Sequence, residues 1–372
     1  MPEIWFKYGT TDIVLDIKFE NLLKHVSSDY PSLTEDEIKS ALKDVKIGEN
    51  TLILVLSGSR SIAKIITILS QTAQSKGYEM TTVDALPNIA EPLRSYLTDT
   101  KISLRRIDYL SLQDKIDKYR NVVFISQVTY DPLFGFNGTP TLALRNFMKD
   151  KMYEAFKSRQ SNLPRVGVKG TPFEIALRYC EDIPALSIEV VANYHGIAGI
   201  YYGNISQSFN DAVTKLSAIS IINTESTKSA IISVSNEIVP HLTLANSLTS
   251  LWNSSHIVKE GGSLVMLAEN RHGIGGGALQ MFIEGKLKIE DARTSSSYID
   301  GLEHMLFIEA LKQKYELCIL SSIPEYYLRT LLGFTTYTGM KDILRDLLAK
   351  HGKQHKVLAV SDAEIILLKT IL

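Results

Sequence analysis

Short apolar runs alternate with amphipathic stretches through the first half of the chain. Residues 51–56 are apolar and rich in β-forming side chains, which predicts a strand buried on both faces. After a small polar loop, apolar positions recur at helical spacing over residues 62–73. The same succession returns as a buried strand at residues 122–128 and a helix at residues 142–157. This alternation predicts a mostly parallel sheet joined by right-handed crossovers.

Weaker patterns predict the remaining elements. Alternating apolar residues indicate a hairpin at residues 4–17, and residues 32–37 have the hydroxyls and acids of a helix start. Further strands are expected at residues 80–83, 186–193, 198–202, 230–234, 263–268, 317–321 and 356–360, and further helices at residues 90–97, 208–217 and 342–348.

A change of pattern near residues 182–184 divides the chain, and 372 residues suit two domains. We predict an α/β protein with a Rossmann-like, mostly parallel N-terminal domain over residues 1–183. A smaller C-terminal α/β domain is expected over residues 184–360, and residues 361–372 are expected to return to the first domain. An interdomain cleft is the expected place for a ligand.

Composition excludes several classes of partner. The formal net charge is −1, with lysines scattered along the chain, so neither nucleic acid nor a membrane surface is an expected partner. No apolar run has the length of a membrane span, and the N-terminus lacks a signal-peptide pattern. The two cysteines, Cys180 and Cys318, lie in apolar stretches and are expected to be buried free thiols. We therefore expect a cytoplasmic protein, whose oligomeric state the sequence leaves open.

Three loops that follow predicted strands contain candidate ligand-binding residues. Ser57, Ser59, Arg60 and Ser61 precede a helix, where free backbone amides, hydroxyls and a guanidinium favour a carboxylate or phosphate. Alternatively, the serines only cap the helix. The spacing of neither a P-loop nor a dinucleotide-binding fingerprint is present.

The second loop contains Gly135, Asn137 and Gly138, whose glycines would let the backbone approach a ligand closely. An ordinary turn explains the same composition. The third loop contains Asn270, Arg271, His272 and Gly273. His272 is the best candidate for a general acid or base, because imidazole titrates near neutral pH, although a lone histidine is more often structural.

The sequence contains little that indicates a metal-binding site. His351 and His355 are spaced four residues apart, but Gly352 lies between them in a polar loop. Neither a Cys–His cluster, a His-Glu-x-x-His pair nor a Gly-x-Ser-x-Gly elbow occurs. We predict no metal site.

Several segments, taken in order, resemble the nickel-pincer-dependent lactate racemase family across nearly the whole chain. They are Phe6-Lys7-Tyr8-Gly9, Asp16, the loops at residues 57–61 and 134–138, residues 260–263, Ala268-Glu269, residues 272–275 and residues 299–303. The resemblance implies two α/β domains, a nickel pincer cofactor derived from nicotinic acid mononucleotide, and racemisation or epimerisation of 2-hydroxy acids.

At the positions where the family has its cofactor-holding residues, this chain has different residue types. Thr141 stands where the family has the lysine that binds the cofactor covalently, and a hydroxyl cannot form that amide. Asp131 stands where the family has a histidine before the glycine loop, and another family histidine falls near Leu86-Pro87. Asp131, with His272, is therefore the catalytic candidate, and Thr141 joins the ligand-binding candidates. We expect no bound cofactor.

At the remaining motif positions, Ser57 stands where the family has an aspartate, and Leu302 stands where it has a tryptophan. Arg60 matches the arginine of the family's motif. We therefore predict a divergent relative that binds a small carboxylate or mononucleotide in the interdomain cleft. One alternative is an active 2-hydroxy-acid racemase or epimerase, an isomerase that uses the pincer nucleotide without the usual tether. Another is a non-catalytic scaffold or partner subunit of an active paralogue.

Overall fold

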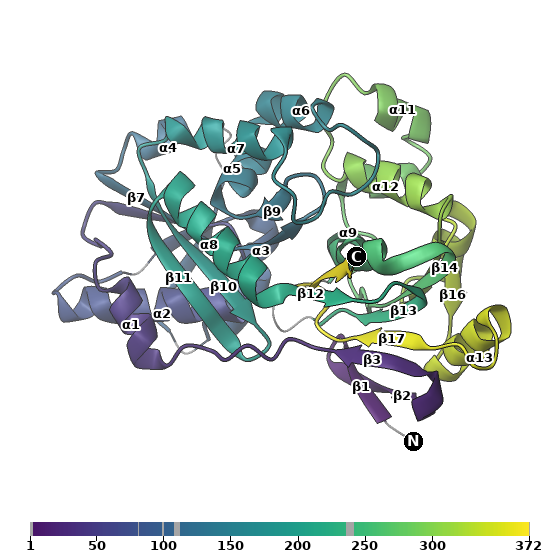
Figure 1. Cartoon of the computed structure of the whole chain (residues 1–372). Helices are drawn as coiled ribbons and strands as arrows, with labels where there is room; N and C mark the ends of the chain where they lie inside the picture. The colour runs from purple at the N-terminus through teal and green to yellow at the C-terminus, as the bar shows by residue number, and fades with distance from the viewer. Residues whose placement is uncertain (1–2, 81, 99, 108–111, 236–241, 372) are drawn as a thin grey trace.

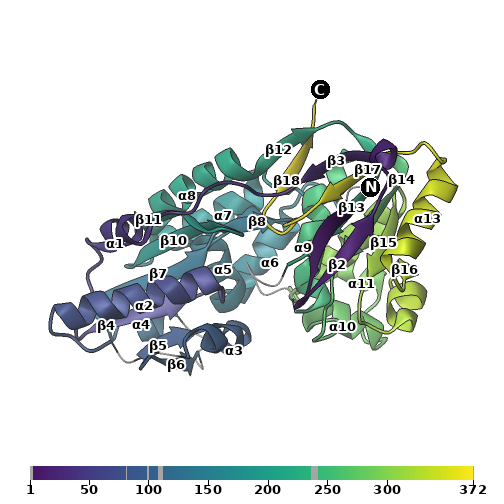
Figure 2. The ribbon, with the colours of Figure 1, turned by 90° about the horizontal axis from the view of Figure 1, so that it is seen from below.

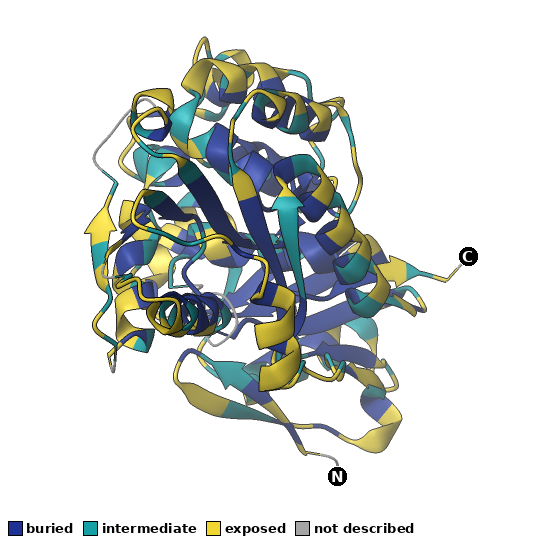
Figure 3. Ribbon diagram, turned by 90° about the vertical axis from the view of Figure 1, so that its left-hand side faces the viewer, coloured by how far each residue is buried: buried dark blue, intermediate teal, exposed yellow. Residues whose placement is uncertain are grey.

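The computed structural model describes residues 3–371 apart from residues 81, 99, 108–111 and 236–241. Two six-stranded sheets form two lobes, and helices cover both sheets (Figure 1). Buried residues follow the strands and the inner faces of the helices, whereas exposed residues follow the outer faces (Figure 3). The predicted α/β class, with largely parallel sheets, is confirmed.

The first sheet has the strand order β11-β10-β7-β4-β5-β6. Its pairs are parallel except for the antiparallel hairpin of β10 and β11. The central strands β4 and β7 are buried along nearly their whole length, as expected for a sheet with helices on both faces. The strands are β4 (Thr51–Val55), β5 (Thr82–Ala85), β6 (Ser103–Arg106), β7 (Asn121–Gln127), β10 (Leu186–Asn193) and β11 (Gly196–Asn204).

Apolar side chains pack α1, α2 and α3 on one face of this sheet and α4, α5, α7 and α8 on the other. A capping box starts α1: Thr34 Oγ1 accepts from the Glu37 amide (3.3 Å), and Glu37 Oε2 accepts from the Thr34 amide (2.7 Å). The helices are α1 (Glu35–Leu42), α2 (Arg60–Ser75), α3 (Pro87–Tyr96), α4 (Gln113–Ile116), α5 (Thr139–Phe147), α6 (Lys149–Lys157), α7 (Thr171–Glu181) and α8 (Ile205–Ser220).

The second sheet has the order β16-β15-β14-β13-β17-β3, and all its pairs are parallel. Its strands are β3 (Leu22–Val26), β13 (Thr227–Ser233), β14 (Val258–Leu267), β15 (Glu316–Leu320), β16 (Thr335–Tyr337) and β17 (Val357–Val360). Helices α9, α10 and α12 pack on one face, whereas α13 and the antiparallel hairpin of β1 and β2 pack on the other. These elements are β1 (Glu3–Tyr8), β2 (Thr11–Asp16), α9 (Leu244–Ser254), α10 (Gly277–Ile283), α11 (Ile289–Thr294), α12 (Leu302–Lys312) and α13 (Met340–His351).

A continuous apolar core joins the two lobes. Phe173 and Phe209 of the first lobe belong to the same buried cluster as Trp252 and Met266 of the second. The parallel pair of β12 and β18 lies at the junction (Figure 2). The short elements are β12 (Ile221–Thr224), β18 (Leu367–Thr370), the hairpin of β8 (Thr129–Asp131) and β9 (Gly135–Asn137), the single turns η1 (Phe19–Asn21) and η2 (Ser255–Ile257), and the π-helical η3 (Tyr326–Leu331).

The boundary expected at residues 183/184 does not coincide with the division between the sheets. The hairpin β10–β11 belongs to the first sheet, and β3 belongs to the second. An unpaired edge of β7 or β17 would leave backbone hydrogen-bonding groups without partners. Strand β10 pairs with that edge of β7, and β3 pairs with that edge of β17. The last strand, β18, pairs with β12 at the junction rather than with the first sheet.

Two expected elements also differ in extent. The helix expected over residues 142–157 is two helices, α5 and α6, separated at Met148, whose backbone is non-helical (φ −138°, ψ 82°). The strand expected at residues 80–83 is β5, which begins at Thr82, and residue 81 lies outside the described residues.

Both cysteines are buried free thiols, as predicted. Burial raises the pKa of the Cys318 thiol to about 12, with a smaller contribution from Glu316, so this thiol stays protonated and unreactive. Among the described residues, no helix is both long and apolar enough to cross a membrane.

Candidate functional site

The carboxyl ends of β4 and β7 form a topological switch point in the first sheet. These strands are parallel neighbours, but β4 continues through α2 to β5 on one side, whereas β7 leads through α5, α6 and α7 to β10 on the other. Helices α2 and α5 therefore start on opposite faces of the sheet. In open α/β sheets, this arrangement leaves room for a ligand beyond the strand ends.

A polar cluster of Ser57, Ser59 and Gln127 occupies the switch point on the α2 side, with Ser59 and Gln127 buried and Ser57 partly exposed. Ser59 Oγ caps α2 by accepting from the Ile62 amide (3.2 Å) and donates to Gln127 Oε1 (2.5 Å). The backbone N–H of Gln127 donates to Ser57 Oγ (3.0 Å). Two of the three serines expected in this loop, Ser57 and Ser59, thus contact Gln127, which the sequence analysis did not single out.

The side-chain amide nitrogen of Gln127 in this cluster is a hydrogen-bond donor without an acceptor in the described part of the chain. Its side chain is 2% exposed, and Nε2 has no hydrogen-bond partner among the described residues. A buried donor without an acceptor costs about 1–3 kcal/mol, so such groups require an explanation. The sequence signal was the polar pair Ser126-Gln127 at the end of a mostly apolar strand.

Arg60 and Ser61 lie in the first turn of α2, where the side chain of Arg60 is exposed. The guanidinium lies over the Tyr96 ring of α3, with Cζ 5.9 Å from the ring centroid. Gly58 is packed against the same helix: a Cβ there would lie 2.9 Å from Ile89 Cβ. The expected ligand-binding arginine is therefore at the helix start but turned toward α3.

The loop containing Gly135, Asn137, Gly138 and Thr141 is folded onto itself. Thr141 Oγ1 donates to Asn137 Oδ1 (2.9 Å) and accepts from the Gly138 amide (3.0 Å). Gly135 has φ 85°, and a Cβ there would lie 2.2 Å from the Val168 carbonyl oxygen. Glycine at these positions therefore allows close packing within the protein.

The buried carboxylate of Glu189 occupies the start of α5. Its oxygens accept from Ser126 Oγ (2.5 Å) and from the Thr139 amide (3.3 Å). Burial raises the pKa of Glu189, although the hydrogen bonds from Ser126 and Thr139 oppose that shift. Because this carboxylate already lies at the positive end of α5, the helix start is not open to a second anion.

Asp131 takes part in a buried ion-pair network that links the two lobes. Its Oδ1 accepts from the amides of Leu133 (2.8 Å) and Phe134 (2.7 Å), and its Oδ2 pairs with Arg145 Nη2 (3.0 Å). Arg145, on α5, also pairs with Glu303 at the start of α12 (2.9 Å). A general base at Asp131 would have to give up these contacts, so the structure places this residue in an interlobe contact.

The third loop follows β14 in the second lobe. Asn270 is buried with φ 53°, and its side chain accepts from Ser247 Oγ (2.6 Å) and donates to Ser321 Oγ (3.2 Å). Arg271 and His272 are exposed, and Gly273 has φ 80°. Asn270 is therefore structural, whereas Arg271 and His272 are available to solvent.

Beside this loop, Glu269 lies against the start of the chain. Its Oε2 is buried without a hydrogen-bond partner among the described residues, and a Cβ at Gly9 would lie 1.7 Å from it. Burial, and secondly the charge of Glu269, raise the pKa of Tyr8 to about 12. Among the described residues, no hydrogen bond or ion pair connects the three expected loops to one another.

His351 and His355 lie close together, with ring centroids 5.0 Å apart. Each Nε2 is engaged by a serine hydroxyl: Ser263 Oγ lies 3.0 Å from His351, and Ser229 Oγ lies 2.6 Å from His355. Nowhere in the described part of the chain do three His, Cys, Asp or Glu residues form a group that could hold a metal ion.

The stability of the protein should fall as pH is lowered from about 6.5 toward 4. Burial, then His351 and Lys228, lower the pKa of His355 to about 4. The unfolded chain takes up this proton near its ordinary pKa of about 6.5, whereas the folded protein resists it, so stability is lost in between. Urea unfolding of His355→Gln should show a shallower decline over this range than wild type. The exposed His195→Gln is the control, and a slope unchanged in His355→Gln would contradict the assignment.

No protein-family model matches this sequence, and no curated protein matches it. The fold, however, is similar to solved structures. One is a lactate racemase apoprotein from Thermoanaerobacterium thermosaccharolyticum, with a TM-score of 0.76 and 12% identity over 99% of this chain and 100% of that one. Another is a protein from Thermotoga maritima, with a TM-score of 0.70 and 10% identity over 92% of this chain and 100% of that one. The chain therefore has a lactate-racemase-like fold.

The loop that the family resemblance assigns to a tethered pincer nucleotide does not fit that group. No lysine occurs between residues 129 and 148, and Thr141 is buried with its hydroxyl already engaged. Phe209 fills the space beside the loop, since a Cβ at Gly138 would lie 2.4 Å from Phe209 Cε2. Asp131, which stands where the family has a histidine, forms an ion pair with Arg145.

Proposed function

We propose that this chain is a divergent relative of the lactate racemase fold that binds a small carboxylate or the phosphate of a mononucleotide at the switch point. The observation that carries the proposal is the buried, unused Nε2 donor of Gln127 beside the start of α2. An anionic oxygen is the acceptor that would satisfy this donor. No tethered nickel cofactor is part of the proposal.

The start of α2 supplies further attraction for an anion. The helix has 16 residues, and its first amides, at Arg60 and Ser61, have no acceptor within the helix. The helix dipole places partial positive charge at the same point, within reach of the hydroxyls of Ser57 and Ser59. Among the three expected loops, this one alone combines a helix start with a buried unpaired donor, whereas Glu189 occupies the start of α5.

Arg60 would add a mobile positive charge at the rim of this site. Its exposed side chain rests on Tyr96, a contact worth about 0.5–1 kcal/mol at exposed sites. A charge-assisted hydrogen bond to a carboxylate or phosphate is worth about 1.5–3 kcal/mol. A bound anion would therefore outweigh the contact with Tyr96 and draw the guanidinium toward the start of α2.

Thermal unfolding in the presence of lactate or of nicotinic acid mononucleotide tests the proposal. A ligand at about 100 times its Kd stabilises the folded state by about 2.7 kcal/mol, so at least one of these anions should raise the Tm of wild type. Gln127→Glu keeps the acceptor for Ser59 but replaces the Nε2 donor with a carboxylate oxygen, and should abolish the rise. Arg60→Ala should reduce it.

Gln74→Glu, an exposed change near the other end of α2, is the matched control and should respond as wild type. The proposal is contradicted if neither anion raises the Tm, or if Gln127→Glu shows the full rise. Elemental analysis and intact-mass measurement of protein purified from its own cells distinguish the racemase alternative from the proposed function. Stoichiometric nickel or a nucleotide-derived mass increase would favour that alternative over ours.

A further inference from the structure

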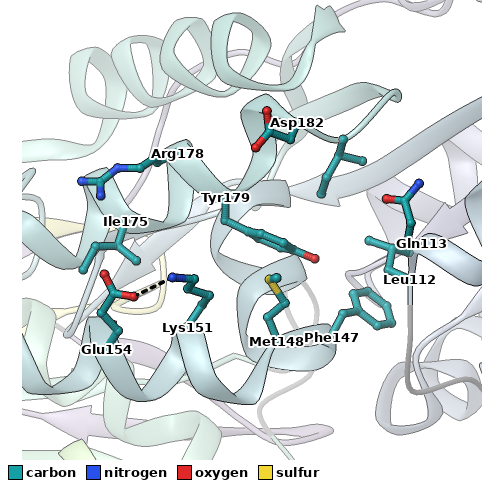
Figure 4. Close-up of a pocket in the computed structure, with 11 residues that line it drawn as sticks. Leu112, Gln113, Phe147, Met148, Lys151, Glu154, Ile175, Arg178, Tyr179 and Asp182 are labelled. Atoms are coloured by element: carbon teal, nitrogen blue, oxygen red, sulfur yellow. Dashed lines mark hydrogen bonds and ion pairs between the residues drawn. The ribbon is translucent and has the colours of Figure 1, made fainter.

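A pocket of about 570 Å³ lies among α4, α5, α6 and α7, away from the loops described above (Figure 4). It opens where the chain breaks between α5 and α6 at Met148, so that Phe147 and Met148 both line it. Its volume falls within the range of about 300–1,000 Å³ typical of small-molecule sites. None of the residues expected to bind a ligand lines it.

The pocket has an apolar end. Leu112 and Phe147 lie at this end with the amide of Gln113 beside them, and Met148 and the ring of Tyr179 lie near the middle (Figure 4). Ile183 also lines the pocket. Phe147, Met148 and Ile183 are only partly buried, although each is large and apolar. A concave surface of such side chains favours an apolar ligand body, because binding removes that surface from water.

The opposite end carries charge. Arg178, Lys151 and Glu154 gather there (Figure 4), and Lys151 pairs with Glu154 (3.0 Å), which leaves the charge of Arg178 unpaired at this end. The carboxylate of Asp182 also lines the pocket, nearer to its middle (Figure 4). Neither the guanidinium of Arg178 nor the hydroxyl of Tyr179 makes a hydrogen bond or ion pair with another described residue. Burial, with a smaller contribution from Cys180, raises the pKa of Tyr179 to about 12, so its hydroxyl, which points toward the apolar end (Figure 4), stays neutral.

We infer that this pocket is a second binding site, for an amphipathic monoanion with an aromatic or branched aliphatic body. The acid group pairs with Arg178 at the charged end, whereas the Tyr179 hydroxyl, which points toward Phe147 (Figure 4), lies beside the apolar body. The apolar body lies against Met148 and Phe147. Arginine recognises a carboxylate or sulfonate with two parallel hydrogen bonds, which gives the site its preference for an acid. This inference is independent of the proposed function, because no residue is shared between the two sites.

Fluorescence titration with anilinonaphthalene sulfonate tests the inference, because this probe has an aromatic body and one acid group and brightens in an apolar site. Wild type should bind it saturably. Arg178→Gln removes the charge and should raise the Kd about tenfold, the effect of losing a charge-assisted contact. Ile183→Trp fills the apolar end and should abolish binding. Phenylpropionate should displace the probe at least tenfold better than phenylpropionamide.

Arg293→Gln, which removes an exposed arginine on α11 in the other lobe, is the matched control and should bind as wild type. If Ile183→Trp does not fold, Met148→Gln replaces it, because a polar amide in the apolar floor should also weaken binding. Failure of wild type to bind the probe would overturn the inference. So would an unchanged Kd in Arg178→Gln, or equal displacement by the acid and its amide.

Discussion

Arg145→Met should lower the free energy of unfolding by about 3–5 kcal/mol, because it leaves buried carboxylates without their counterion. The side chain of Arg145 is 15% exposed and pairs with Asp131 (3.0 Å) and with Glu303 (2.9 Å), which is 1% exposed. Tyr298 is a further partner, at 2.6 Å from Nη1. Against a typical stability of about 5–15 kcal/mol, such a loss is large and measurable by urea unfolding.

Arg345→Met is the matched control, since it removes an exposed arginine that pairs with Asp342 (2.6 Å), and it should cost at most about 1 kcal/mol. Adding Glu303→Gln to Arg145→Met removes one of the stranded charges and should recover part of the loss. An effect of Arg145→Met no larger than that of the control would mean that the network does not hold the lobes together.

Phe209→Ala should destabilise the protein by about 3–5 kcal/mol, the usual effect of truncating a buried aromatic side chain. Phe209 is fully buried on α8 and stacks on Phe173, with ring centroids 5.5 Å apart. It belongs to the cluster that joins both lobes, and its ring touches Gly138 beside Glu189. The loss should be seen as a lower urea midpoint with the same dependence on denaturant.

A second pair of variants tests the contact itself. Gly138→Ala alone should cost about 1–3 kcal/mol, because its Cβ would overlap the ring of Phe209. Combined with Phe209→Leu, which makes room, Gly138→Ala should cost less than it does alone. Additive effects of the two changes would show that the ring is not what requires glycine at position 138.

Local patterns in the sequence predicted most of the elements. The buried runs at residues 51–56 and 122–128 are the central strands β4 and β7, and the helical spacing over residues 62–73 is the buried face of α2. These predictions succeeded because periodicity and capping depend on residues only a few positions apart. The break at Met148 left no such signal, and one long helix was wrongly predicted.

The candidate site was only partly predictable. Ser57 and Ser59 were expected at a helix start, and the structure places them there with Gln127. The glycine loop was expected to face a ligand, but Glu189, more than 50 residues later, occupies the start of its helix. Asp131 was expected to be catalytic, yet its partner Arg145 connects it to Glu303 in the other lobe.

The sequence by itself determined the α/β class, the strands buried on both faces, the helix caps and the burial of both cysteines. Each follows from the polarity and conformational preference of neighbouring residues. Only the tertiary structure decided which sheet β3 and β10 join, which buried polar groups find partners, and where a pocket opens. Those outcomes depend on contacts between residues far apart in the chain, where the edge of one strand or the charge of one side chain is satisfied by a distant segment.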